Sequence, residues 1–448
     1  MLFFKAKKSI GLDIGTHSVK AVQMSRRGGR LCIDEVGYAL VDRNQVNSDP
    51  VIAHASAVSE ALMGMNLNSS QLVGALPGQT VVIRYPRYAE SARDQLEEIV
   101  SREAGQNIPY DLTEVSLDWT LLDEVEEAGQ RQLKVLLVAA KHENIDSRVQ
   151  IMDATELEFA VLGVDSLALA DAAEACDFLR VGETVALVNI GLTSASIHFV
   201  KDGISNFIRD VNWGSRELIH SIAKELRCEY EEAERRLQDF LVESADEAAA
   251  EEPPPVTGTD PGDPFAVPAV ENLNDTLEDS GAAIQTPDSL TDFGDDPFGE
   301  AEPASPPSPM SVGGGSLLDP LDDEMDDSFG VQSASPMGMA EEVEPDMRDI
   351  VSTSLSKMVS EIRRSFDYYE HQLYERPVDR LVVSGGIAHS DMVCTTLLEE
   401  LGVESVDVAN PTSSALYVAD DMSMGKMLEQ PAQFMVAVGL AARGMADL

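Results

Sequence analysis

This sequence contains little that would place it in a membrane or outside the cell. Its 448 residues include only four cysteines, Cys32, Cys176, Cys228 and Cys394, which have neither metal-ligand nor disulfide spacing. Scattered cysteines favour a reducing compartment. No stretch approaches the roughly 20 apolar residues that span a bilayer, and the apolar start of the chain is too short for a signal peptide. We therefore expect a cytoplasmic protein that does not insert into a membrane.

Positive charge is also scarce. The chain carries 79 acidic and 32 basic side chains, and its formal net charge is −47. Residues 243–346 hold 27 of the acids and no Lys or Arg, which leaves 52 acidic against 32 basic side chains elsewhere. Because an acidic surface repels nucleic-acid phosphates and anionic lipids, we expect neither as a direct partner.

The acidic segment 243–346 is predicted to be disordered. It holds 15 of the 22 prolines and few aliphatic clusters, so burial cannot offset the chain entropy. Three triplets in it, Asp263-Pro-Phe265, Asp296-Pro-Phe298 and Asp327-Ser-Phe329, each combine an acid, a turn former and an aromatic ring. They are docking motifs for a partner or chance products of the composition, and the sequence favours neither.

What the chain does contain is a short β-hairpin near its start. Two apolar runs, 10–14 and 19–24, flank the small turn Gly15-Thr-His-Ser18. The N–H groups of residues 15–18 would suit a phosphate, and Lys20 adds a positive charge. Asp13 can hold the water shell of Mg²⁺. A hairpin turn without a ligand is the alternative.

The same hairpin recurs 176 residues later, within 185–200. The copies align as Ile14 with Ile190, Gly15 with Gly191, His17 with Thr193, and Ser18 with Ser194. A duplicated unit supports a common role more strongly than either copy alone. We therefore expect two similar lobes that face each other, each with a phosphate-binding turn.

Six blocks in order resemble the actin-like ATPase superfamily and, within it, the type IV pilus assembly protein PilM family. They are residues 11–20, 107–110 followed by 117–119, 186–191, 361–369, 382–386 and 436–442. The resemblance implies an α/β actin-like ATPase fold, with two duplicated lobes around a nucleotide cleft, a small inserted α/β subdomain and a long disordered insertion. The first lobe would be 1–180, with the subdomain at about 40–140. The second would be 181–242 with 347–448, and 243–346 the insertion.

The resemblance also implies ATP and Mg²⁺ as cofactors. The implied nucleotide contacts are Asp13 (which would hold Mg²⁺ through water), Gly15, Thr16, His17, Ser18, Lys20, Asn189, Gly191, Thr193, Ser194, Gly385, Gly386 and Ile387. In the family, the inserted subdomain helps to form a groove for the short cytoplasmic N-terminal tail of the inner-membrane protein PilN. That implies a location beside the inner membrane, near other pilus inner-membrane and motor components. The resemblance leaves open whether the protein forms a homo-oligomer.

Two residues bear on catalysis. Asp165 precedes a predicted helix at 166–177 and has the character of an N-cap; the family places a water-positioning residue near it, which makes it the candidate catalytic group. Asn189 departs from the aspartate that many superfamily members carry in the second phosphate loop. An amide is a much poorer base than a carboxylate, so we expect slow or absent ATP hydrolysis.

Three functions follow as hypotheses: a nucleotide-switched scaffold, a filament-forming actin homologue, and a sugar-kinase-like phosphotransferase. Elsewhere the periodicity predicts helices at 52–63, 89–104, 144–160, 215–242, 347–372 and 433–443, and strands at 31–41, 72–76, 80–84, 115–122, 133–140 and 378–383. We expect the last helix to pack back on the first lobe.

Overall fold

The computed structural model describes residues 8–127, 129–250, 346–419 and 424–446. Helix α7 (Tyr230–Ala250) continues past residue 243, the predicted start of the acidic segment. The prediction of disorder otherwise concerns residues 251–345, which lie outside the described residues, as do the three acid–aromatic triplets.

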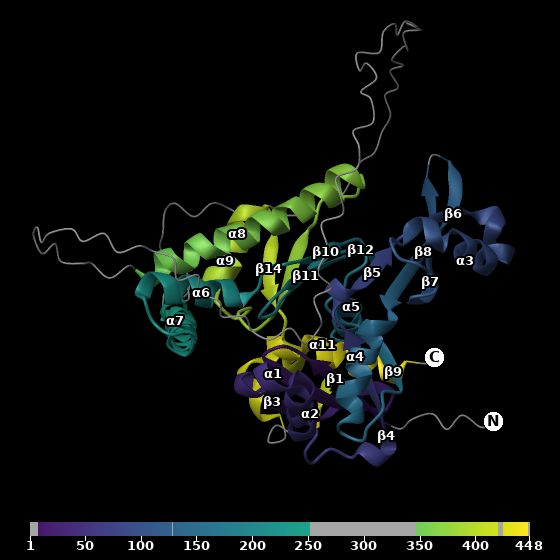
Figure 1. The fold of residues 1–448 in the computed structure, drawn as a ribbon. Helices are drawn as coiled ribbons and strands as arrows, with labels where there is room; N and C mark the ends of the chain where they lie inside the picture. The colour runs from purple at the N-terminus through teal and green to yellow at the C-terminus, as the bar shows by residue number, and fades with distance from the viewer. Residues whose placement is uncertain (1–7, 128, 251–345, 420–423, 447–448) are drawn as a thin grey trace, which may run out of the picture. The chain divides into compact units, whose positions relative to one another are not determined.

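Two sheets form the body of the protein (Figure 1). The first has the order β15-β3-β2-β1-β4-β9 and the second the order β12-β11-β10-β13-β14. The strands of the first are β1 (Lys8–Ile14), β2 (Ser18–Arg27), β3 (Arg30–Leu40), β4 (Ser70–Leu76), β9 (Val161–Val164) and β15 (Tyr417–Val418). Those of the second are β10 (Thr184–Ile190), β11 (Ala195–Lys201), β12 (Ile204–Val211), β13 (Arg380–Gly385) and β14 (Ser405–Val408).

The two sheets repeat one topology, which confirms the duplication predicted from sequence. In each, the first strand pairs antiparallel with the second and parallel with the fourth, and the second pairs antiparallel with the third. The hairpin registers also match, because Ile14 faces Val19 in one copy and Ile190 faces Ala195 in the other. The 176-residue offset is therefore a structural equivalence.

Helices α5 (Asp165–Ala175) and α11 (Met435–Met445) share one buried core with strands of both sheets. Their approach to each other and to β1 is close enough to require glycine. A Cβ on Gly11 would lie 2.0 Å from the Ala437 carbonyl oxygen, and one on Gly439 would lie 1.8 Å from that of Ala168. The closing helix thus packs closely on β1 of the first sheet.

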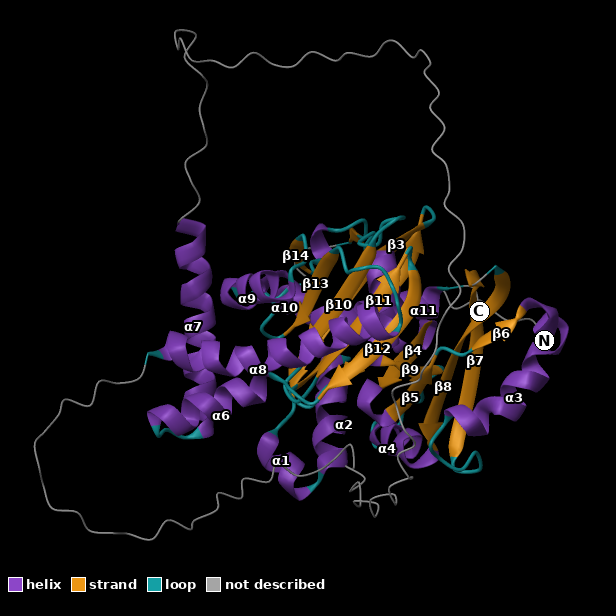
Figure 2. Cartoon of the chain, turned by 90° about the horizontal axis from the view of Figure 1, so that it is seen from above, coloured by secondary structure: helices purple, strands orange, loops and turns teal. Residues whose placement is uncertain are grey.

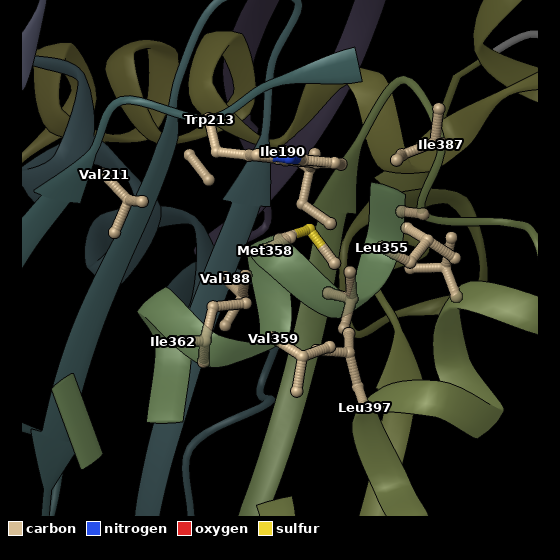
Figure 3. Close-up of a cluster of buried hydrophobic side chains, with 14 of the residues drawn as sticks. Val188, Ile190, Val211, Trp213, Leu355, Met358, Val359, Ile362, Ile387 and Leu397 are labelled. Atoms are coloured by element: carbon tan, nitrogen blue, oxygen red, sulfur yellow. The ribbon is translucent and has the colours of Figure 1, made fainter. Parts of the chain in front are cut away.

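Other helices cover the outer faces of the two sheets. The buried side chains of α2 (Pro50–Ala61) and α4 (His142–Asp153) join the core of the first sheet, with α1 (Arg43–Ser48) beside them. The second sheet packs against α6 (Ser215–Leu226), α7, α8 (Met347–Asp367) and α9 (Asp391–Leu401). Figure 3 shows Met358 and Ile362 of α8 against Val188 and Ile190 of β10. Burying such a side chain contributes about 1.5–3 kcal/mol.

A smaller third sheet corresponds to the predicted inserted subdomain, but the predicted bounds of about 40–140 begin too early, because β4 pairs within the first sheet and α1 and α2 pack on it. It consists of β5 (Val81–Arg84), β6 (Arg87–Ala89), β7 (Val115–Glu127) and β8 (Gln130–Lys141). Helix α3 (Leu96–Asn107) packs on it through a core that includes Val100, Leu133 and Leu137. Figure 2 shows α3 beside β6 and β7. We call residues 81–141 the inserted module.

Two long predicted helices are wrong in detail. The predicted helix 215–242 is two helices, because Arg227 takes a left-handed conformation (φ 51°) and ends α6. The predicted helix 347–372 is α8 followed by a π-helical turn, Tyr368–Gln372.

A short helix, α10 (Gly425–Glu429), precedes α11. Among the described residues, none of the helices combines the length and apolar character needed to cross a bilayer.

Candidate functional site

One cavity of about 960 Å³ brings all of the sequence-predicted site residues together. Its lining includes Asp13, Gly15, Thr16, His17, Ser18, Lys20, Asp165, Asn189, Gly191, Thr193, Ser194, Gly385, Gly386 and Ile387. These residues come from the two equivalent hairpin turns, from the turn after β13 and from the start of α5. We call this cavity the cleft.

The two turns have the same internal hydrogen bond. The Gly15 N–H donates to the Ser18 carbonyl oxygen at 3.2 Å, and the Gly191 N–H donates to that of Ser194 at 2.9 Å. These two glycine N–H groups are therefore occupied within their own turns. The backbone N–H groups at 16–17 and 192–193 have no acceptor among the described residues. Those four groups are available as donors for an anion.

The equivalent positions beside the two turns differ in charge. In the first copy, Lys20 lies opposite Asp13, with 3.3 Å between Nζ and Oδ2. In the second copy the same pair of positions holds Asn189 and Ser196. The Asn189 Oδ1 accepts a hydrogen bond from the Ser384 hydroxyl at 3.1 Å. The first turn thus carries the charged pair and the second a neutral one.

The glycine pair after β13 has two different roles. Gly385 has φ 102°, and a Cβ there would lie 2.1 Å from the Ile190 carbonyl oxygen. Its small size is therefore required by the neighbouring strand rather than by a ligand. At Gly386 a Cβ would meet nothing within 4 Å, although its N–H donates to the Ile190 carbonyl oxygen at 3.1 Å. Gly386 is the one that leaves space on the cleft side.

Asp165 lies at the start of α5, but the N-cap prediction is wrong by one residue. Strand β9 runs directly into the helix, so Val164 is the N-cap and Asp165 the first helical residue. The Asp165 Oδ1 accepts the N–H of Gly78 at 2.8 Å and of Ser166 at 2.5 Å. Burial, followed by the charge of Asp210, raises the pKa of Asp165 to about 7. Burial raises the pKa of Asp210 to about 6.

The cleft also contains groups that sequence reasoning missed. Asp210 is the last but one residue of β12 and faces Gly78, Arg148 lies on α4, and Glu234 lies on α7. Glu234 accepts from the Arg43 guanidinium at 2.5 Å and lies 3.8 Å from the His17 Nδ1. Burial is the main cause that lowers the His17 pKa. No local motif marks these positions; the duplicated topology is the signal that would have directed attention to the end of β12.

The residues present fit a magnesium ion that arrives with a nucleotide. Within the described ranges, no group of three or more His, Cys, Asp or Glu side chains is arranged to hold a metal. Mg²⁺ commonly keeps several waters and binds through one or two carboxylates plus substrate phosphates. Asp13 lines the cleft beside the first turn and would contribute such a carboxylate.

The duplicated sheets, with their two turns facing one cleft, define a protein of the actin-like ATPase fold. The sequence model of the family "Type IV pilus assembly protein PilM" matches residues 11–242 and 337–445, more than half of the chain. The chain therefore belongs to the type IV pilus assembly protein PilM family.

Solved structures match this chain at low sequence identity. A PilM-PilN type IV pilus biogenesis complex matches with a TM-score of 0.61 and 16% identity, over 99% of this chain and 100% of that chain. The ethanolamine utilization protein EutJ from Carboxydothermus hydrogenoformans matches with 0.43 and 11%, over 97% and 89%. MreB 5 of Spiroplasma citri bound to AMPPNP matches with 0.39 and 10%, over 97% and 94%.

Proposed function

We propose that this chain is a nucleotide-switched scaffold of the type IV pilus assembly machine. ATP with Mg²⁺ would bind in the cleft and hold the two lobes in one arrangement. The observation that carries this proposal is the convergence of two equivalent turns, each with two unoccupied N–H groups, on a single cavity of about 960 Å³. Backbone N–H groups in a concave turn suit phosphate oxygens.

Each group in the cleft has a role in this proposal. The N–H groups at 16–17 and 192–193 would bind phosphate oxygens, Lys20 would add a positive charge, and Asp13 would hold the water shell of Mg²⁺. The base and ribose would lie toward Gly386 and Ile387, where the structure leaves open space at Gly386. Bound Mg²⁺ would neutralise phosphate charge. Asn189 is an uncharged amide bonded to Ser384 and a poor general base, so we expect slow hydrolysis. The scaffold role does not require rapid hydrolysis.

A thermal-unfolding titration tests the nucleotide assignment. Saturating Mg²⁺-ATP should raise the unfolding midpoint of the wild-type protein, because a ligand that binds only the folded state stabilises it by mass action. Lys20→Ala should reduce this rise and Asp13→Ala should reduce its dependence on Mg²⁺. Lys224→Ala, at an exposed position on α6 outside the cleft, is the matched control. An unchanged wild-type midpoint would contradict the assignment.

The partner half of the proposal needs a separate test. The cytoplasmic N-terminal tail of a PilN-like inner-membrane protein would bind the inserted module and hold the chain beside the inner membrane. The support is family membership together with the apolar Leu112, 39% exposed after α3. Leu112→Glu should weaken binding of a synthetic tail peptide, whereas Leu398→Glu, equally exposed on α9, should not. Equal binding by both variants would contradict this placement.

The alternatives can be distinguished with the same protein. Incubation with ATP, followed by phosphate release and electron microscopy, would reveal a filament-forming ATPase by both readouts. A phosphotransferase would instead need a sugar or another hydroxyl acceptor before ATP is consumed. Little phosphate release and no filaments is the result expected of a scaffold.

A further inference from the structure

A buried arginine in the cleft wall has no assigned role so far. Arg148 projects from α4, is only 7% exposed, and lines the cleft together with Asp13 and Asp165. Its Nε is buried and has no hydrogen-bond partner. Among the described residues, its guanidinium also forms no ion pair within 4 Å. Two other cations that line the cleft are paired, Lys20 with Asp13 at 3.3 Å and Lys426 with Glu429 at 3.2 Å. Arg216 of α6 also lines the cleft without an ion pair among the described residues, but it is more exposed than Arg148.

A buried guanidinium without partners is costly unless an anion comes to it. Removing a charge from water carries a penalty of several kcal/mol, which close pairing can offset. Burial lowers the pKa of Arg148, and the negative charges of Asp13 and Asp165 act in the opposite direction. Neither carboxylate is within ion-pair distance of it, and the Asp165 Oδ1 already accepts two backbone N–H groups. The local carboxylates therefore attract Arg148 without satisfying its donors.

A phosphate group has the shape and charge that such a site requires. The planar guanidinium presents five donors in a fork that matches two phosphate oxygens at once. Arg148 and Lys20 both act on Asp13, the carboxylate proposed to hold the Mg²⁺ water shell. In nucleotide sites, Mg²⁺ bridges oxygens of the β- and γ-phosphates. A cation near that carboxylate would therefore lie close to the terminal phosphate.

We propose that Arg148 binds the terminal phosphate of the nucleotide and makes the cleft prefer ATP to ADP. This inference rests on the nucleotide binding proposed above, and it adds the residue that distinguishes the two nucleotides.

The position of α4 gives this contact a route to the partner site. Strand β8 of the inserted module ends at Lys141, and α4 begins at the next residue. The Asn144 side chain of α4 also donates to the Thr80 carbonyl oxygen at 3.0 Å, close to Gly78, whose N–H is bound by Asp165. A phosphate held by Arg148 would thus fix α4 and the start of the inserted module together.

The test measures dissociation constants of ADP and of a non-hydrolysable ATP analogue by calorimetry with Mg²⁺. Arg148→Met should weaken the triphosphate by roughly 10- to 100-fold, the range for a lost hydrogen bond to a charged group, and ADP by less than about threefold. Arg148→Lys should keep part of the preference, because it retains the charge without the fork. Arg102→Met, on the surface of the inserted module, is the control and should change neither constant.

The possible results separate this inference from the proposed function. If the wild-type protein binds neither nucleotide, the proposed function fails. If it binds both equally, or if Arg148→Met weakens both by the same factor, only the role of Arg148 is overturned. If Arg148→Met does not fold, two other variants are compared, Asp165→Asn and the double variant Arg148→Met/Asp165→Asn. In the double variant the negative charge at residue 165 is removed together with the guanidinium that acts on it. An unchanged ATP-to-ADP ratio in that pair would also overturn it.

Discussion

Replacing Asp165 with asparagine should stabilise the protein at pH 8 and have little effect at pH 4. Burial and the neighbouring Asp210 raise the pKa of Asp165 from its ordinary value of 3.8 to about 7. An asparagine Oδ1 can accept the same hydrogen bond from the Gly78 N–H, now 2.8 Å away, without carrying a charge. The substitution therefore removes the cost of ionising this half-buried carboxyl and keeps its contact with Gly78.

The sign and size of the effect follow from proton linkage. A carboxyl whose pKa is higher in the folded state binds more protons when folded, so its contribution to stability falls as the pH rises from about 4 to about 7. A difference of about three between the two pKa values of Asp165 corresponds to about 4 kcal/mol. Because the side chain is only half-buried and faces the cleft, solvent screening should reduce this to about 2 kcal/mol at pH 8.

The assay is urea unfolding of the wild-type and Asp165→Asn proteins without nucleotide between pH 3 and pH 8. Glu183→Gln is a control of opposite sign, because hydrogen bonds from Arg380 lower the pKa of Glu183. That variant should lose stability at neutral pH, and its deficit should shrink as the pH falls below the ordinary range of a glutamate. An Asp165→Asn effect that did not change with pH, or a loss of stability at pH 8, would refute the reasoning.

Three further outcomes are expected. Asn189→Asp should raise steady-state phosphate release by at most about tenfold, well below the 10²–10⁴-fold of a positioned general base; a rate equal to that of the wild type would show that the amide is not limiting. Gly11→Ala should lower the unfolding midpoint strongly, because its Cβ would lie 2.0 Å from a carbonyl oxygen of α11, whereas Gly386→Ala should change it little; similar midpoints in calorimetry would contradict the packing argument. Glu234→Gln should speed nucleotide release in stopped-flow fluorescence, because it weakens the 2.5 Å ion pair that joins α7 of the second lobe to Arg43 on α1 of the first. An unchanged release rate would show that this ion pair does not control nucleotide release.

The duplicated hairpins could be predicted because their signals are local. Each copy combines alternating apolar residues with a small turn, and the offset between the copies is constant through both strands. The Gly385–Gly386 turn was also visible as a glycine pair between a strand and a helix. The sequence could not show that Gly385 is required by the Ile190 backbone and Gly386 is not, because that difference depends on which strand lies beside each.

The parts that failed depend on contacts between distant segments. Nothing local marks Arg227 as a helix end, since a left-handed conformation there replaces the usual glycine. Arg148 belongs to a helix with several charged residues, so its sequence pattern indicates a solvent-exposed side chain. Its burial arises only because α4 packs between the first sheet and the cleft. Asp210 is one polar residue at a strand end until the topology places it opposite Gly78.

The duplication also explains why Asn189 matters less by itself than as half of a pair. Position 13 faces position 20 in the first hairpin, and position 189 faces position 196 in the second, in the same register. The first pair is Asp13 with Lys20, separated by 3.3 Å, and the second pair is an amide and a hydroxyl. A carboxylate at 189 would have no cation opposite it, only Ser196 and the Ser384 hydroxyl that already bonds the amide. The carboxylate–ammonium pair beside a turn is therefore confined to the first lobe, which also contributes Arg148. The second lobe has an amide and a hydroxyl at the equivalent positions and contributes Arg216 of α6 to the cleft. Such an asymmetry suits a cleft that holds a nucleotide and couples it to α4 better than one arranged for rapid hydrolysis.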